Sequence, residues 1–118
     1  MTPSLSFPSV VQQVADRRRA HRARLAVAVT ITVAGRLVDA VGADVSPGGM
    51  RLVAARAENV GDEVSLVFFL NGDIVCARGT ICWCAPTRRG LFMFGVKFSA
   101  VEEDGQALVA SYCLASVS

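Results

Sequence analysis

The chain has 118 residues, of which 53% are hydrophobic, so it fits one domain and is too apolar to be disordered. Its longest uncharged stretches, such as 25–35, are well short of the roughly 20 apolar residues that a membrane-spanning helix needs. The net charge is +2, and no basic start precedes an apolar run at the N-terminus. From these features we expect neither a membrane-spanning helix nor a secretion signal, and they predict a cytoplasmic location.

The N-terminal part divides into a leader and a basic segment. Residues 1–16 contain Pro3, Pro8 and scattered Ser, and we expect them to form a flexible leader before a domain that spans 17–118. The segment 17–24 then carries five Arg and no acid, whereas the other residues hold seven bases and ten acids. Such a cluster is suited to an anion, although a solvated basic tail is an equally good interpretation of the cluster alone.

Beyond the arginines, apolar and small residues alternate with a period of two, which is typical of strands. The clearest pattern lies at 25–34. Further strands are expected at 37–45, 50–54, 64–70, 74–84 and 92–98, with a bend in the fifth strand at Gly79. Asn71 and Gly72 predict a hairpin turn, and Pro47 and Gly48 predict a type II turn with a positive φ at the glycine.

The C-terminal tail changes to a helical period. Acidic residues at 102–104 suit the beginning of a helix. The four residues that fall on one apolar face of that helix are Leu108, Val109, Tyr112 and Cys113. Six antiparallel strands joined by short turns, followed by one helix, predict an all-β fold: a six-stranded antiparallel β-barrel, which has no exposed edge, with a C-terminal α-helix.

Nothing in the sequence predicts an enzyme, a metal site or a cofactor. The motifs H-x-x-x-H and G-x-S-x-G are absent, and the single histidine, His21, lies among arginines without a nearby carboxylate. The four cysteines form no C-x-x-C pair, so zinc is not expected. Cys82 and Cys84 could form a redox pair, but we expect all four to be buried, reduced thiols.

Two groups of residues have the chemistry to bind a guanine nucleotide. Arginine side chains form paired hydrogen bonds with phosphate and with the O6 and N7 atoms of guanine. Asp44 and Ser46 lie two residues apart at a strand end, so both should face the same side. A carboxylate there could accept from guanine N1 and N2, and Gly49 would allow a close backbone approach. The alternative for this second group is a turn whose side chains satisfy only local backbone.

Together the two groups resemble the motifs of the PilZ family. Arg18 and Arg22 match R-x-x-x-R, and residues 44–49, D-V-S-P-G-G, match D/N-x-S-x-x-G in full. The resemblance covers about residues 17–115. It implies a six-stranded barrel with a C-terminal helix and a ligand, cyclic di-GMP, which is a bacterial second messenger. By position, Arg18 and Arg22 would contact phosphate and guanine, Arg17 would add a further contact, and Asp44, Ser46 and Gly49 would hold a guanine.

The aromatic residues give weaker evidence for a binding site. Trp83, which we expect to share a strand face with Ile81, could stack on a base, but we expect it to pack across the barrel. The phenylalanines at 68–69 and 92–98 are expected in the core.

The resemblance implies a receptor or adaptor that changes conformation on binding cyclic di-GMP and signals to a partner protein, in motility, pili or exopolysaccharide control. The alternative is an interaction module with this fold that binds no nucleotide. Nucleic-acid binding through the arginine segment is disfavoured by the small net charge. We expect no membrane span and a monomer or weak dimer.

Overall fold

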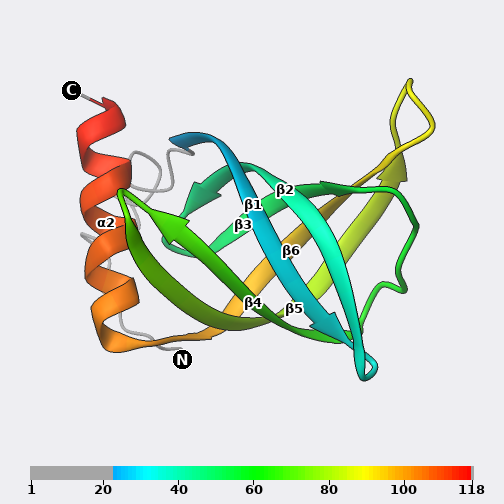
Figure 1. The fold of residues 1–118 in the computed structure, drawn as a ribbon, viewed down its shortest axis with the longest axis horizontal. Helices are drawn as coiled ribbons and strands as arrows, with labels where there is room; N and C mark the ends of the chain where they lie inside the picture. The colour runs from blue at the N-terminus through cyan, green and yellow to red at the C-terminus, as the bar shows by residue number, and fades with distance from the viewer. Residues whose placement is uncertain (1–22, 118) are drawn as a thin grey trace, which may run out of the picture.

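The computed structural model describes residues 23–117, which form six strands and one helix (Figure 1). The strands are antiparallel and close into a barrel in the order β1-β2-β3-β6-β5-β4. Their bounds are β1 Ala23–Val33, β2 Arg36–Ser46, β3 Gly49–Ala54, β4 Glu63–Leu70, β5 Asp73–Pro86 and β6 Phe92–Val101, and the helix is α2, Glu103–Val117. The predicted barrel with a C-terminal helix is confirmed.

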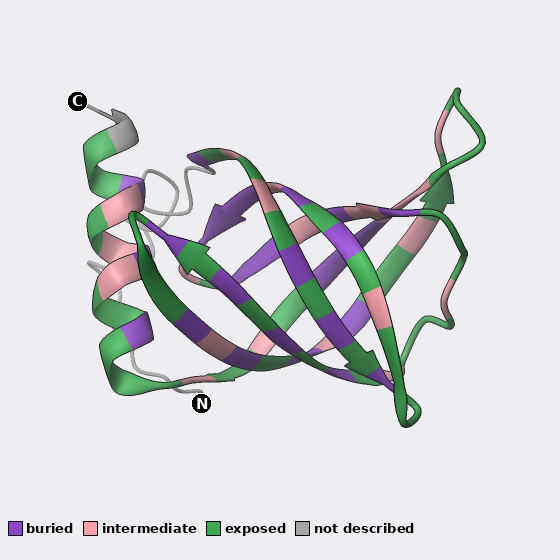
Figure 2. Cartoon of the chain, in the orientation of Figure 1, coloured by how far each residue is buried: buried purple, intermediate pink, exposed green. Residues whose placement is uncertain are grey.

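The core fills the barrel because buried and exposed residues alternate along each strand, as Figure 2 shows. Strand β4 follows this pattern without exception: every second residue from Val64 to Leu70 is buried. The largest fully buried side chains are Phe68, Phe94, Met50, Leu52, Leu66 and Leu70. The second phenylalanine of the pair in β4, Phe69, is 56% exposed, so the prediction that it joins the core is wrong. Strict alternation sends neighbouring residues to opposite faces of a strand.

Two hairpin turns use left-handed backbone. Ala34 and Gly35 have φ angles of 51° and 76°, and Asn71 and Gly72 have φ angles of 52° and 87°. Positive φ at both central residues matches the right-handed twist of the paired strands. The turn between β2 and β3 differs, because Gly48 does not have a positive φ. The predicted type II turn is therefore wrong, although the hairpin is present.

Helix α2 packs across one end of the barrel (Figure 1). Val109 and Cys113 are buried on its inner face, and Leu108 and Tyr112 pack against the core beside them. The first turn lies so close to the barrel that a Cβ on Gly105 would be 3.0 Å from the Cγ1 atom of Val75. The predicted apolar helix face is confirmed. The described residues, which end at 117, include no helix long and apolar enough to cross a membrane.

The strands are interrupted by bulges that change the direction of side chains. The register between β2 and β3 shifts between Gly42 and Asp44, so Ala43 is an extra residue with no partner of its own. A second shift, between β5 and β6, makes Cys82 the extra residue between Ile81 and Trp83. Further shifts occur in β1 and next to the expected bend at Gly79. A bulge bends its strand and re-aims the side chains beside it.

Candidate functional site

Asp44 is a buried carboxylate on the outer face of the barrel. Gly42 faces inward, and the extra residue Ala43 lets the next residue, Asp44, point outward. Ser46 points to the same face, as predicted from its spacing. Relative exposures of only 4% for Asp44 and 6% for Ser46 make them the two buried polar residues of the described chain. Burying a polar group in such a place is costly unless it has hydrogen-bonding or ionic partners.

Arg51 supplies such a partner from the neighbouring strand β3. Its Nε donates to Oδ2 of Asp44 at 2.6 Å, and its Nη2 donates to the same oxygen. The pKa of Arg51 is raised above its ordinary value, chiefly by this hydrogen bond, with partial burial acting in the opposite direction. The arginine side chain remains 42% exposed, whereas that of Asp44 is 6% exposed. The pair therefore has a solvent-facing cation above a covered anion.

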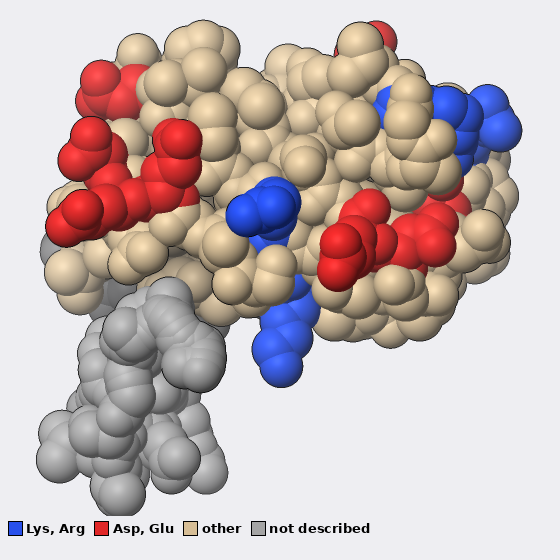
Figure 3. All heavy atoms as spheres, turned by 90° about the horizontal axis from the view of Figure 1, so that it is seen from below, with Lys and Arg blue, Asp and Glu red and all other residues tan. Residues whose placement is uncertain are grey.

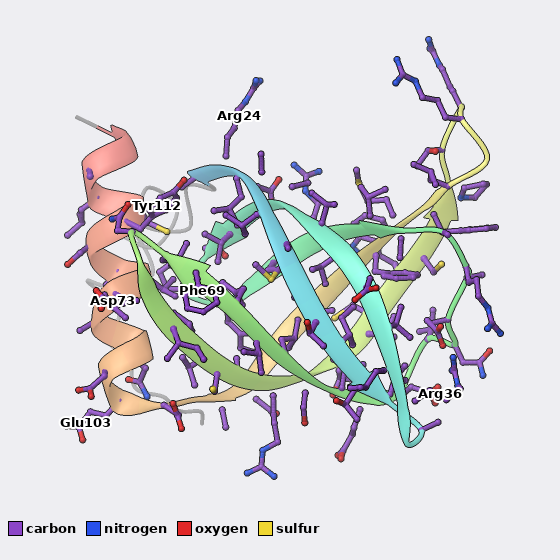
Figure 4. The ribbon with its side chains drawn as sticks, in the orientation of Figure 1. Arg24, Arg36, Phe69, Asp73, Glu103 and Tyr112 are labelled. Atoms are coloured by element: carbon purple, nitrogen blue, oxygen red, sulfur yellow. The ribbon has the colours of Figure 1, made fainter. Side chains whose placement is uncertain are left out.

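Arg24 lies on the other side of Asp44. It is in register with Asp44 on β1, and its exposed side chain extends away from the barrel (Figure 4). The hydroxyl of Tyr112 in α2 donates to the backbone carbonyl of Arg24 at 2.7 Å. Asp44 is thus flanked by an arginine on each neighbouring strand, and the helix is hydrogen-bonded to one of them.

Sequence reasoning missed both flanking arginines as candidate site residues. A usable signal existed for Arg51. Counting outward from the two turn residues Pro47 and Gly48 pairs Ser46 with Gly49, and two further steps pair Asp44 with Arg51, as the structure shows. Arg24 could not be placed in the same way, because the bulge in β1 shifts its register.

The turn at 46–49 is held by its own backbone and by β6. The Ser46 hydroxyl donates to the carbonyl of Gly49 at 3.4 Å, and the amide of Phe98 donates to the carbonyl of Gly48 at 2.9 Å. A Cβ on Gly49 would lie 2.2 Å from the carbonyl oxygen of Val96. Glycine is therefore required at 49 by the approach of β6, whatever binds at the outer face.

Trp83 lies in the same cross-strand row as the ion pair. The row runs over five adjacent strands of the barrel, through Arg24, Asp44, Arg51, Gly95 and Trp83. A Cβ on Gly95 would be only 2.1 Å from Nε1 of Trp83, so the indole covers this glycine. Trp83 is 39% exposed. The predictions that it packs across the barrel and shares a face with Ile81 are wrong, because the bulge turns it outward.

The cysteines are free and differ in exposure. Cys113 is buried, Cys76 and Cys84 are partly buried, and Cys82 is exposed. The prediction that all four are buried thiols is therefore wrong for Cys82, the extra residue of its bulge. The pKa of Cys76 is raised, first by burial and then by the carboxylate of Glu102. Within residues 23–117, no group of three His, Cys, Asp or Glu residues could hold a metal ion.

The remaining predicted contacts are arginines 17, 18 and 22, and with His21 and the leader they lie outside the described residues. Residue 22 is followed directly by Ala23, whose side chain is buried opposite Val45. The acidic residues Glu103 and Asp104 lie in the first turn of α2, and Figure 3 shows acidic side chains gathered at that end of the molecule. The described surface near the beginning of the helix is thus suited to cations rather than to an anion.

Comparisons with known proteins identify the family. The PilZ domain model matches residues 16–115. No curated protein matches the chain. Among solved structures, the chain is similar to the Bacillus subtilis inhibitor of motility MotI/DgrA, with a TM-score of 0.72 and 15% identity over 80% of this chain. It spans about half of that protein, 48% of its length. The family match covers most of the sequence and both of the motifs quoted above, and the chain therefore belongs to the PilZ domain family.

Proposed function

We propose that this protein is a receptor for cyclic di-GMP that signals to a partner protein. The observation that carries the proposal is the buried, ion-paired carboxylate of Asp44 on the outer barrel face, two residues from Ser46 within the family motif. PilZ domains are typically non-catalytic receptors, and cyclic di-GMP is the ligand typical of the family. The proposal needs no reaction at this site, only recognition.

The recognition follows from complementary charges and hydrogen bonds. A carboxylate accepts from the N1 and N2 donors of guanine, whereas adenine lacks this pair of donors. Arg18 and Arg22 would take the phosphates and the O6/N7 edge of a base, with Arg17 as a further contact. Ser46, whose hydroxyl now points at a backbone carbonyl 3.4 Å away, can turn to donate to the ligand.

A signal could reach α2 over a short path. The arginine segment continues without a linker into β1 at Ala23, and β1 is hydrogen-bonded to the helix through the Arg24 carbonyl and the Tyr112 hydroxyl. Cys113, one residue further along the helix, contacts the carbonyl of Val45 between the two site residues of β2. We propose that the arginines shift these contacts when they bind the ligand, and that this changes the surface of α2 that a partner contacts. This requires that ligand binding favours one of two arrangements.

The process that the signal controls is also a proposal. The similar B. subtilis structure is named an inhibitor of motility, which favours motility over pili or exopolysaccharide. A cytoplasmic location would follow from this role.

The test is calorimetry of the full chain with cyclic di-GMP, cyclic di-AMP and GTP. We expect saturable binding of cyclic di-GMP and weaker binding of the other two nucleotides. Absence of heat, together with an unchanged melting temperature at high ligand concentration, would contradict the proposal.

A charge-matched pair of variants tests the role of the arginine motif. Arg22→Ala should lower the affinity roughly tenfold or more, because a charge-assisted hydrogen bond contributes about 1.5–3 kcal/mol. Arg78→Ala removes the same charge from the exposed outer face of β5, in register with Ser65 and Ala100, and should change affinity little. Arg24 is not a clean control, because it lies opposite Asp44. Equal losses at 22 and 78 would show that the positive charge acts only diffusely.

One observation favours the alternative, an interaction module without nucleotide. Arg51 already satisfies part of the hydrogen-bonding capacity of Asp44 from within the chain. A barrel that binds only a protein could keep such a pair for stability. The same titration distinguishes the two functions, because the alternative predicts no binding of any of the three nucleotides.

A further inference from the structure

The ion pair at Asp44 is oriented as well as neutralised. Two nitrogens of Arg51, Nε and Nη2, donate hydrogen bonds to the same carboxylate oxygen of Asp44, Oδ2. Since the guanidinium is a rigid, planar fork, two donors on one atom hold Oδ2 in place and so restrict the rotation of the carboxylate about its last side-chain bond. A lysine, with a single flexible ammonium, would neutralise Asp44 without fixing it to the same extent.

The position of Arg51 beside Asp44 follows from the hairpin. The turn at 46–49 places β3 directly beside β2, with Arg51 opposite Asp44 and Gly95 of β6 beyond it. Because the arginine side chain is 42% exposed, burial of its apolar stem does not account for its position. Its main contact is the carboxylate, which is itself nearly covered.

From this geometry we propose that Arg51 is a positioning residue for guanine recognition: it holds the Asp44 carboxylate in the orientation that pairs with guanine N1 and N2. The inference rests on the proposed function and deepens it. Arg51 contributes to base selectivity through Asp44 and makes no contact of its own with the base edge. The phosphates would be bound by the arginine segment. One half of the site would then select the base, and the other half would bind the charged groups.

The selectivity of an Arg51 variant distinguishes this role from a purely structural one. Arg51→Met keeps an unbranched apolar stem but removes the guanidinium fork and its charge. It should lower the affinity for cyclic di-GMP roughly tenfold or more while leaving the weaker binding of cyclic di-AMP nearly unchanged. A structural defect would instead weaken both nucleotides by the same factor. Arg51→Lys should restore part of the affinity for cyclic di-GMP, and Arg78→Met is the charge-matched control.

A double-mutant cycle tests whether Arg51 acts through Asp44. Titrations of cyclic di-GMP are compared for the wild type, Arg51→Met, Asp44→Ala and the double variant, with the melting temperature of each recorded as a control for folding. If the arginine acts through the carboxylate, the double variant should bind no more weakly than Asp44→Ala alone. If the losses of affinity in the two single variants multiply in the double variant, Arg51 contacts the ligand independently of Asp44. If Arg51→Met binds cyclic di-GMP as well as or better than the wild type, the arginine is a bystander or a competitor. Either result would overturn the inference while the proposed function stands, whereas a wild-type protein that fails to bind cyclic di-GMP would overturn both.

Discussion

The β4–β5 hairpin and the three strands β1 to β3 have similarly alternating sequences but differ in regularity. Strands β4 and β5 pair without interruption from Glu63 and Thr80 to Leu70 and Asp73. Strands β1 to β3 contain two register shifts, both next to Asp44. The regular hairpin contributes large core side chains, and its charged residues, such as Arg78, are exposed, whereas the bulged strands hold the buried carboxylate of Asp44 between two arginines. Irregular pairing is thus found where this barrel holds its buried carboxylate.

The largest expected effect lies in the regular hairpin. Phe68→Ala should destabilise the protein by about 3–5 kcal/mol, because it removes one of the largest fully buried side chains of the barrel. Phe69→Ala, one residue along the same strand, should cost at most about 1 kcal/mol, from its cross-strand contact with Ile74. Urea unfolding of both variants measures the difference. Similar costs would mean that the two faces of β4 are not as different as their exposure indicates. Phe68→Leu provides a milder change if Phe68→Ala does not fold.

The next effect lies in the bulged region and does not depend on a ligand. Gly49→Ala should cost about 1–3 kcal/mol, because its Cβ would lie 2.2 Å from the carbonyl oxygen of Val96, a backbone atom that cannot move independently. Gly48→Ala is the matched control, since no atom lies within 4 Å of a Cβ there, and it should change stability by about 0.5 kcal/mol or less. Thermal unfolding checks both. A Gly49→Ala variant as stable as Gly48→Ala would show that β3 and β6 can separate at this point.

A smaller effect concerns the junction of the helix with β1. Tyr112→Phe removes the hydroxyl that donates to the Arg24 carbonyl at 2.7 Å and should cost about 0.5–1.5 kcal/mol. Hydrogen exchange should show faster exchange at the beginning of β1 and in the second half of α2, with the β4–β5 hairpin unchanged. Faster exchange throughout the barrel would mean that the two regions unfold together and that the comparison between them does not extend to their stability.

The smallest change is a difference in thiol reactivity, which need not alter stability. Cys82 is exposed in its bulge, whereas Cys76 lies in the regular part of β5 and has a raised pKa. A raised pKa lowers the thiolate fraction at neutral pH, so Cys76 should react more slowly with a thiol reagent such as iodoacetamide. Mass spectrometry of peptides from timed reactions gives the two rates. Glu102→Gln should speed the labelling of Cys76 slightly, because burial rather than Glu102 is the main cause of the shift. Labelling of Cys76 as fast as that of Cys82 would contradict the raised pKa of Cys76.

The regular parts of the fold could be predicted from the sequence, because periodic burial and turn chemistry leave clear local patterns. The strand at 64–70 and the turn at Asn71 and Gly72 are examples, and both are confirmed. The bulge in β2 could not be predicted in the same way, since Gly42 and Ala43 are small enough to face either side of a strand. The motif residues of the outer face were singled out by their chemistry and then matched to the family motif, and their placement on one face followed from their spacing. The pairing of Asp44 with Arg51 required the turn as a starting point for counting.

The position of Trp83 over Gly95 has an optical consequence. The chain contains one tryptophan and one tyrosine, and the structure places them at different points: the indole in the cross-strand row with Arg51, and the phenol at the contact between α2 and β1. Fluorescence excited selectively in the indole therefore reports on the polarity around that row, with no contribution from another tryptophan. The phenol emits at shorter wavelengths than the indole and provides a second signal from the helix junction. The unlabelled protein thus carries its own fluorescent reporters for two separate parts of the barrel.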